Sequence, residues 1–529
     1  ERFGSPKYAE MDLSQRPKIR EQVLKKRNKR SVLFNDPNWS KQTYLSGKGS
    51  IIADHNVASA WKKGYTGKNI TVAVVDDGLK YTHEDFKGRY RSKLSYDYVS
   101  NDADPAPSSS DPSKDGHGTN CAGVIAAAAN NGRCGVGVAY DAEIAGIRLT
   151  SAALPGDAQV AKALYPFPGH EIDIFSNSWG PPDTGYIVAG PGPLTLLALR
   201  TGTSKGRGGR GSIYVRSAGN GAIFGDNCAL DGFVNTIYTI PVAAVNKDAR
   251  PSHASESCSA IMTSAYSSNL ETTSVASNTA CDSGFGETSA AAALVSGIIA
   301  LALQARNTLT SRDVQHLIVR SSRSDIIDKS VQWTVNGAGF RVSNRVGFGF
   351  LDASRLIENA ENLNSTLPPQ RKCEIVLRPK PSWGNFETVS FNIQVNSSQC
   401  DGAVISYLEH VVAIFDLEYF KRGVVGAYIT SPGGTKSQVL FPRALDALAG
   451  YKRYENVTTV SVHFWGEQAN GTWTISIKNN LTSQGTGSGT LFGFSLILYG
   501  TSSSPAIWST PKPSTDTGIS STKKMKTRT

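Results

Sequence analysis

The sequence predicts an α/β domain followed by an all-β sandwich. With 529 residues, the chain is long enough for two or more domains. From about residue 50 to 365, short β-branched runs alternate with longer alanine-rich segments, which is typical of a mostly parallel, buried sheet covered by helices. Beyond residue 365, apolar residues follow period two or form short runs between Gly, Asn and Ser turns, as in a β-sandwich.

The elements of the α/β part follow one another in strand-then-helix order. The expected strands lie at residues 70–78, 142–149, 171–180, 211–221 and 237–245. The longest expected helices are the alanine-rich runs at residues 117–129 and 289–305. Because the carboxyl ends of parallel strands meet at one edge of a sheet, we expect the chemistry in the loops at that edge.

The second part consists of apolar runs separated by turns. These runs lie at residues 389–395, 410–419, 424–432, 472–479 and 490–500. The remaining 29 residues are rich in Ser, Thr and Pro and cannot bury enough apolar surface to order themselves. We therefore divide the chain into residues 1–30, an α/β domain at 31–365, a β-sandwich at 366–500 and a tail at 501–529.

The net charge of +11 belongs to the two ends of the chain. Residues 1–30 carry a net charge of +6 and residues 501–529 carry +4, which leaves +1 on the body. No basic stripe with interleaved aromatic residues marks that body. Nucleic acid is therefore not an expected partner.

Seven cysteines are compatible with three disulfides and one free thiol, and none has the close spacing of a zinc site. Glycosylation sequons accompany them at Asn69, Asn364, Asn396, Asn456, Asn470 and Asn480. Both features indicate an oxidising compartment. A basic cluster at residues 23–30 is either a solvated charge run or a processing site, because it ends in Lys29-Arg30.

Three candidate catalytic residues stand at strand or helix ends. Asp76 closes an apolar strand, His117 lies between glycines before a helical run, and Ser289 opens the long apolar helix. Singly, they read as a turn residue, a helix-terminal residue and an N-cap. Together they match what nucleophilic catalysis by a hydroxyl needs, a base and a carboxylate that orients it. Asn220, in a Gly-flanked loop, is a candidate oxyanion donor, a contact worth about 2.7 to 4 kcal/mol.

The segments VVDDG, DGHGTNCAG, SNSWGP, SAGNG and GETSAAAA resemble the motifs of subtilisin-type serine proteases. GDNCALDGFVNTIYTI and HFWGEQANGTW extend the resemblance to the kexin and furin group of proprotein convertases, nearest the fungal kexins. The resemblance covers about residues 20 to 500. It implies a subtilisin-like catalytic domain, a jelly-roll-like P domain, and a hydrolase with Asp76, His117 and Ser289 as its triad.

The resemblance also implies an endopeptidase that cleaves proproteins after paired basic residues, Lys-Arg or Arg-Arg. Asp183 and Asp231 match the positions that hold the basic P1 side chain, and Asp77 matches one that contacts P2. Burying a guanidinium without a carboxylate partner is very costly, so acids are needed there. The alternative interpretation is that these are ordinary acids of surface loops.

Calcium is the implied cofactor, since hard oxygen donors on loops suit that ion. By resemblance, one site would use Asp54, Asp85 and Asn131, a second Asp183, Asp226 and Glu256, and a third Asp97 and Asp104. The implied disulfides are Cys134–Cys281, Cys228–Cys258 and Cys373–Cys400, with Cys121 free.

Within this family, residues 1–30 resemble the end of a propeptide, with Ser31 as the first residue of the mature enzyme. The expected partners are therefore the chain's own propeptide and proproteins with dibasic sites. The expected location is the secretory pathway, at the Golgi membrane or the cell surface, with a membrane anchor plausible beyond residue 529.

Several residues depart from the family pattern. Glu287 stands where relatives have Gly, and at about 6 to 8 Å from the oxyanion its charge would slow acylation by about 30- to 150-fold. Ala293 replaces a Pro, and Lys114 replaces an acid that faces P2 and would repel a basic side chain there. Ala161 and Ala189 replace acids that hold a P4 Arg. The alternative function is therefore a catalytically weakened paralogue that acts as a surface glycoprotein or binding protein.

Overall fold

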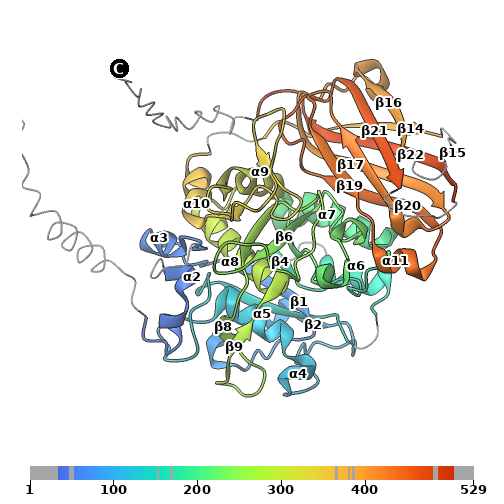
Figure 1. The fold of residues 1–529 in the computed structure, drawn as a ribbon. Coiled ribbons are helices and arrows are strands. Elements are labelled where there is room, and N and C mark those ends of the chain that lie inside the picture. The colour runs from blue at the N-terminus through green and yellow to red at the C-terminus, as the bar shows by residue number, and fades with distance from the viewer. Residues whose placement is uncertain are drawn as a thin grey trace, which may run out of the picture.

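The computed structural model describes residues 34–46, 53–151, 154–166, 171–363, 367–378, 382–383, 388–479 and 487–505. The expected propeptide, Ser31 and most of the expected tail therefore lie outside the described residues. The described chain forms an α/β part and a β-sandwich that pack side by side (Figure 1).

The α/β part is built on a nine-stranded sheet with the order β10-β13-β7-β6-β5-β4-β1-β3-β2. All neighbouring strands in it run parallel except β10 and β13. The strands are β1 (Thr71–Asp76), β2 (Tyr96–Asp97), β3 (Glu143–Arg148), β4 (Ile174–Asn177), β5 (Ile213–Ser217), β6 (Thr239–Val245), β7 (Thr263–Tyr266), β10 (Ser322–Arg323) and β13 (Phe350–Leu351). Two small ribbons pair β8 (Leu270–Thr273) with β9 (Cys281–Phe285), and β11 (Thr334–Val335) with β12 (Arg341–Val342).

Helices cover both faces of this sheet because the central strands are apolar on both sides. Val72 and Val74 of β1 join the core with α5 and α8, whereas Ala73 and Val75 join the core with α6 and α7. The helices are α2 (Thr43–Ser46), α3 (Val57–Lys62), α4 (Pro112–Asp115), α5 (His117–Ala126), α6 (Asp157–Leu164), α7 (Pro193–Gly209), α8 (Glu287–Ala305), α9 (Ser311–Ser321) and α10 (Ala353–Glu361).

Helix α8 is the one helix among the described residues with the length and hydropathy to cross a membrane. It packs inside the α/β part, where 89% of its apolar window is buried. Its composition is therefore explained by the core that surrounds it.

The second part is a sandwich of two antiparallel sheets. One has the order β14-β22-β17-β20 with β15 paired to β22, and the other has the order β16-β21-β18-β19. The strands are β14 (Arg371–Leu377), β15 (Ser382–Trp383), β16 (Thr388–Val395), β17 (Tyr407–Tyr419), β18 (Val425–Thr430), β19 (Lys436–Leu440), β20 (Arg453–Ser461), β21 (Gly471–Asn479) and β22 (Gly489–Thr501), with helix α11 (Ala444–Ala449). A separate apolar core fills the space between the sheets.

The two parts share an apolar interface and polar contacts. Val412, Val460 and Ile497 of the sandwich pack into the same cluster as the disulfide-bonded Cys228 and Cys258.

The disulfides confirm the implied cysteine pairing. They are Cys134–Cys281, Cys228–Cys258 and Cys373–Cys400, and Cys121 is free and buried.

Candidate active site

Asp76 and His117 meet at the carboxyl edge of the sheet. Asp76 is the last residue of β1, and His117 is the first residue of α5. The His117 Nδ1 lies 2.8 Å from Asp76 Oδ1. The carboxylate is buried while the imidazole is half-buried, so the base keeps one open side toward solvent or substrate.

Asp77 supports the same histidine through the backbone. Its carboxylate accepts the N–H of His117 at 2.9 Å and that of Gly118 at 2.7 Å. A side chain on Gly118 would place a Cβ 2.3 Å from the Gly78 carbonyl, so only glycine allows this approach. Burial, and then the charge of Asp76, raises the pKa of Asp77 to about 7.

Two carboxylates also act on the imidazole itself. Burial alone disfavours the imidazolium, but the charge and hydrogen bond of Asp76, together with the charge of Asp77, raise the pKa of His117 to about 9. An imidazole oriented by a buried carboxylate is the arrangement of a general base, which acts in its neutral form.

Ser289 lies in the first turn of α8 and is buried. Its hydroxyl lies 3.5 Å from the carbonyl of Ser178, the residue after β4. Within the described part of the chain, no hydrogen bond joins Ser289 to His117. Such bonds between catalytic groups often tighten only when substrate binds.

Asn220 is turned so that its amide N–H₂ remains available. Its side-chain oxygen accepts the Thr288 N–H at 3.1 Å and the Thr288 hydroxyl at 2.7 Å. These two contacts identify the oxygen and leave the opposite end of the amide as a donor. Thr288 precedes Ser289, so the candidate nucleophile and the candidate oxyanion donor are tied to the same turn.

A cleft of about 530 Å³ opens beside these groups. It is lined by Asp76, Asp77, His117, Trp179, Gly180 and Phe233, among others. Ala189, expected by resemblance to face P4, also lines it. The cleft gives an extended peptide a place to lie across His117.

The two candidate P1 acids lie beside the cleft residues. Asp183 accepts the backbone N–H of Asn220 at 3.1 Å, and burial raises its pKa. Asp231 accepts the Phe233 N–H at 2.7 Å and lies 3.7 Å from the guanidinium of Arg216. The sequence did not lead us to predict that Arg216 lies beside this site. An arginine inside an otherwise apolar strand could have indicated a buried charge there.

Three candidate calcium ligands gather around one space, and one of them, Asp183, is also a candidate P1 acid. Glu256 is buried, and burial followed by the charges of Asp226 and Asp183 raises its pKa to about 10. A Cβ on Gly221 would come within 3.0 Å of atoms of all three residues, so the glycine leaves the space around which they gather. Acidic side chains gathered around one space offer the oxygen donors that a hard divalent cation prefers. Arg443 of the sandwich also reaches this group, at 3.1 Å from Asp226 Oδ1.

The first predicted calcium site is only partly as expected. Asn131 Nδ2 lies 2.6 Å from Asp85 Oδ1, and the buried Asp85 Oδ2 has no hydrogen-bond partner among the described residues. Asp36, not Asp54, completes the group, because its carboxylate accepts the Asn131 N–H at 3.2 Å. An orphaned carboxylate oxygen beside two further oxygen-bearing side chains fits calcium.

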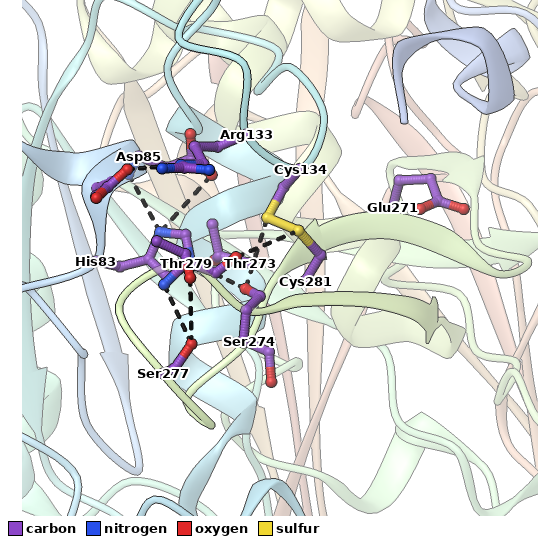
Figure 2. Close-up of a disulfide and its surroundings, with 12 residues drawn as sticks. His83, Asp85, Arg133, Cys134, Glu271, Thr273, Ser274, Ser277, Thr279 and Cys281 are labelled. Atoms are coloured by element: carbon purple, nitrogen blue, oxygen red, sulfur yellow. Dashed lines mark hydrogen bonds and ion pairs between the residues drawn. A yellow bond between two sulfur atoms is a disulfide. The ribbon is translucent and has the colours of Figure 1, made fainter. Parts of the chain in front are cut away.

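Asp54 has other neighbours: its carboxylate accepts the Asn56 N–H at 3.0 Å and lies close enough to Asp352 for the two charges to interact. The prediction for Asp54 was therefore wrong, and sequence alone missed Asp36. Figure 2 shows Asp85 and His83 beside the Cys134–Cys281 disulfide, which anchors this corner of the domain.

Both residues predicted for the third calcium site have protein partners. Asp97 is buried and pairs with Arg148 at 2.7 Å, while its other oxygen accepts the N–H groups of Val99 and Ser100. Asp104 is exposed and accepts the Ala106 N–H. The carboxylate of Asp97 is therefore satisfied by protein groups, and calcium binding by Asp97 and Asp104 stays a prediction.

The structure locates the residues that depart from the family pattern. Glu287 adopts φ +61°, a left-handed conformation that favours glycine, and its side chain is exposed. Ala293 is buried inside α8. Lys114, in α4, is exposed and lies 3.7 Å from Asp111, and Ala161 lies in α6. The exposure of Glu287 means that solvent screens its charge.

Comparison with known proteins defines the class. The model described as "Subtilase family" matches residues 67–349, and that described as "Proprotein convertase P-domain" matches residues 408–498. The chain belongs to the subtilase family of serine peptidases and carries a convertase P domain. This confirms the predicted fold class and does not favour the weakened-paralogue alternative.

Its relatives include proprotein convertases. The chain is 40% identical to proprotein convertase subtilisin/kexin type 6 of Rattus norvegicus over 92% of its length and 53% of the relative's. It is 39% identical to the human type 4 enzyme, over 93% of this chain and 65% of that enzyme. It is 40% identical to rat furin, over 92% of this chain and 60% of furin. The chain therefore spans about half to two-thirds of these relatives. A crystal structure of the Aeromonas sobria serine protease shares the fold, with a TM-score of 0.76 and 22% identity over 89% of this chain and 96% of that one.

Proposed function

We propose that this chain is a calcium-dependent serine endopeptidase that cleaves proproteins after paired basic residues. The observation that carries the proposal is the Asp76–His117 pair, 2.8 Å apart, at a cleft whose neighbourhood also holds Asp183 and Asp231. The names of its relatives, proprotein convertases and furin, support the same substrate class.

In the proposed reaction, Ser289 Oγ attacks the scissile carbonyl while His117 takes its proton. Asp76 holds the imidazole and stabilises the imidazolium that forms. The Asn220 side-chain N–H and the Ser289 backbone N–H then donate to the oxyanion, aided by the N-terminal end of α8. His117 returns the proton to the leaving amine, and water releases the acyl group by the same path.

Calcium would be held by Asp183, Asp226 and Glu256, and at a second place by Asp36, Asp85 and Asn131. Bound there, the ion supplies positive charge that keeps clustered carboxylates ionised. Asp183 would thus keep its negative charge for a basic P1 side chain, because the alternative for a crowded carboxylate is to take up a proton.

The proposed setting is the secretory pathway, at the Golgi membrane or the cell surface, since three disulfides suit an oxidising compartment. The proposed partners are proproteins with dibasic sites and the chain's own propeptide.

The test uses the purified chain, a fluorogenic peptide ending in Lys-Arg, and Ser289→Ala as a matched control. Cleavage after Arg in calcium is expected, with a loss of roughly 10⁶-fold in kcat for Ser289→Ala. Chelation of calcium and Glu256→Gln should each lower activity. Equal turnover by the chain and Ser289→Ala would overturn the proposal.

A further inference from the structure

Arg216 is a charged side chain buried within the wall of the substrate cleft. It is the fourth residue of β5, where it pairs with Asn177 of β4 and Pro241 of β6. Its side chain is only 3% exposed. A buried guanidinium is costly unless it has partners, so its surroundings carry information about what the site does.

Aromatic rings hold this guanidinium on two sides. Its central carbon lies 4.5 Å from the ring centroid of Trp179 and 4.8 Å from that of Phe233. Its Nη2 lies 3.7 Å from Asp231 Oδ2, which is an ion pair longer than a hydrogen bond. Within the described residues, neither Nε nor Nη2 donates a hydrogen bond.

The ion pair lies directly behind the cleft surface. Trp179, Gly180 and Phe233 line the same cleft as His117. A Cβ on Gly180 would lie 3.2 Å from both Arg216 Nη2 and Asp231 Oδ2, so only a glycine separates the pair from the cleft. Any substrate cation that reaches Asp231 must therefore come close to the charge of Arg216.

We infer that Arg216 is a specificity-determining residue of the P1 pocket, which supplies Asp231 with a cation from within the chain and so admits neutral P1 side chains beside basic ones. The inference rests on the proposed function, because that function assigns Asp231 to P1. In a pocket with unpaired acids, a neutral P1 side chain leaves buried carboxylates without a partner. Here Arg216 remains as the partner of Asp231, and the same charge repels a basic P1 side chain.

The first experiment measures binding without catalysis. In a Ser289→Ala background with calcium present, p-aminobenzamidine serves as a cationic P1 probe, and calorimetry gives its Kd. Arg216→Met should bind the probe at least tenfold more tightly, whereas Arg216→Lys, which keeps the charge, should stay within about threefold of its parent. Adding Asp231→Asn to Arg216→Met should cancel the gain. An unchanged Kd for Arg216→Met, or a gain that survives Asp231→Asn, would overturn the inference.

The second experiment compares two substrates on each active enzyme. The ratio of kcat/KM for a Lys-Arg peptide to that for a Lys-Gln peptide should rise at least tenfold in Arg216→Met. Arg207→Met is the matched control, because Arg207 is also buried but pairs with Asp173 at the amino ends of the strands. A loss of folding changes both rates together and leaves the ratio unmoved. Absence of cleavage of either peptide by wild type would count against the proposed function, while the binding result would still decide the inference.

Discussion

At the scale of single residues, His117 is governed by the carboxylates around it. Asp76 contacts the imidazole, and Asp77 accepts the two backbone N–H groups that start α5. Both carboxylates favour the protonated imidazole, yet catalysis needs the neutral form as a base. Because the pKa of His117 is raised to about 9, kcat/KM should increase with pH, and the midpoint of that increase should lie above the pKa of an ordinary histidine.

Asp77→Asn tests this electrostatic arrangement. With one negative charge removed, the pKa of His117 falls, so the midpoint of the acidic limb of kcat/KM should move lower by about one pH unit. The measurement is the pH profile of kcat/KM from pH 5 to 10. Asp104→Asn, which removes an exposed carboxylate, is the control and should leave the midpoint in place. A midpoint that stays fixed in Asp77→Asn would contradict the assigned electrostatics.

We expect Thr288 to act on catalysis through Asn220. Its hydroxyl and N–H hold the Asn220 side-chain oxygen, so Thr288→Val removes one of the two contacts that aim the amide. We expect kcat to fall about tenfold with little change in KM, whereas Asn220→Ala should cost about 10²- to 10³-fold. In a double-mutant cycle, the Thr288→Val effect should vanish once Asn220 is removed. Additive effects would show that Thr288 acts independently.

At the scale of elements, the beginning of α8 combines strain and function. Glu287 takes φ +61° immediately before the turn that carries Thr288 and Ser289. A side chain costs about 1 to 2 kcal/mol in that conformation, whereas glycine enters it freely. The element therefore tolerates a side chain at the expense of stability, and Glu287 is exposed whereas Ser289 is buried.

Glu287→Gly should raise the free energy of unfolding by about 0.5 to 1 kcal/mol, after the added flexibility of the unfolded chain is subtracted. Because the carboxylate is exposed, kcat should change less than about threefold. Denaturant titration and steady-state kinetics measure the two effects. Asp401→Gly, at φ +51° and likewise exposed, should also gain stability. A 30-fold rise of kcat in Glu287→Gly would instead show that its charge acts on the oxyanion.

At the scale of the whole molecule, polar groups join the peptidase and P domains. His316 of α9 lies 2.8 Å from Glu409 of β17, and Arg312 also pairs with this carboxylate. His463 is buried, and its carbonyl accepts a hydrogen bond from Asn336 of the peptidase domain. Burial lowers the pKa of His463 to about 4.

The lowered pKa of His463 predicts an acid-sensitive fold. Its neutral form contributes fully above the unfolded pKa of about 6.5, and stability is lost as the pH falls from there toward 4. At pH 5 the loss from this residue is about 2 kcal/mol. His463→Gln should reduce the difference in unfolding free energy between pH 7 and pH 5 by that amount. The exposed His253→Gln is the control, and an identical pH dependence in both variants would refute the assignment.

Local pattern was sufficient for most of the fold. Apolar runs ending in Asp76 and in the Asn220 loop mark strands because a sheet buried on both faces admits few polar residues. Motif spacing likewise placed Asp76, His117, Ser289 and Asn220 at one edge of the sheet. The cysteine pairs needed the family resemblance in addition, since seven cysteines alone allow many connectivities.

Only the tertiary structure decided which distant charges meet. Asp36, and not Asp54, lies with Asn131 and Asp85. Asp97 forms an ion pair with Arg148, and Arg216 lies beside Asp231 in the wall of the cleft. Periodicity reports whether a residue is buried and on which face, because it reflects the local repeat of the backbone. The partner of a buried charge depends on loops that approach from far along the chain, and no local repeat encodes that approach.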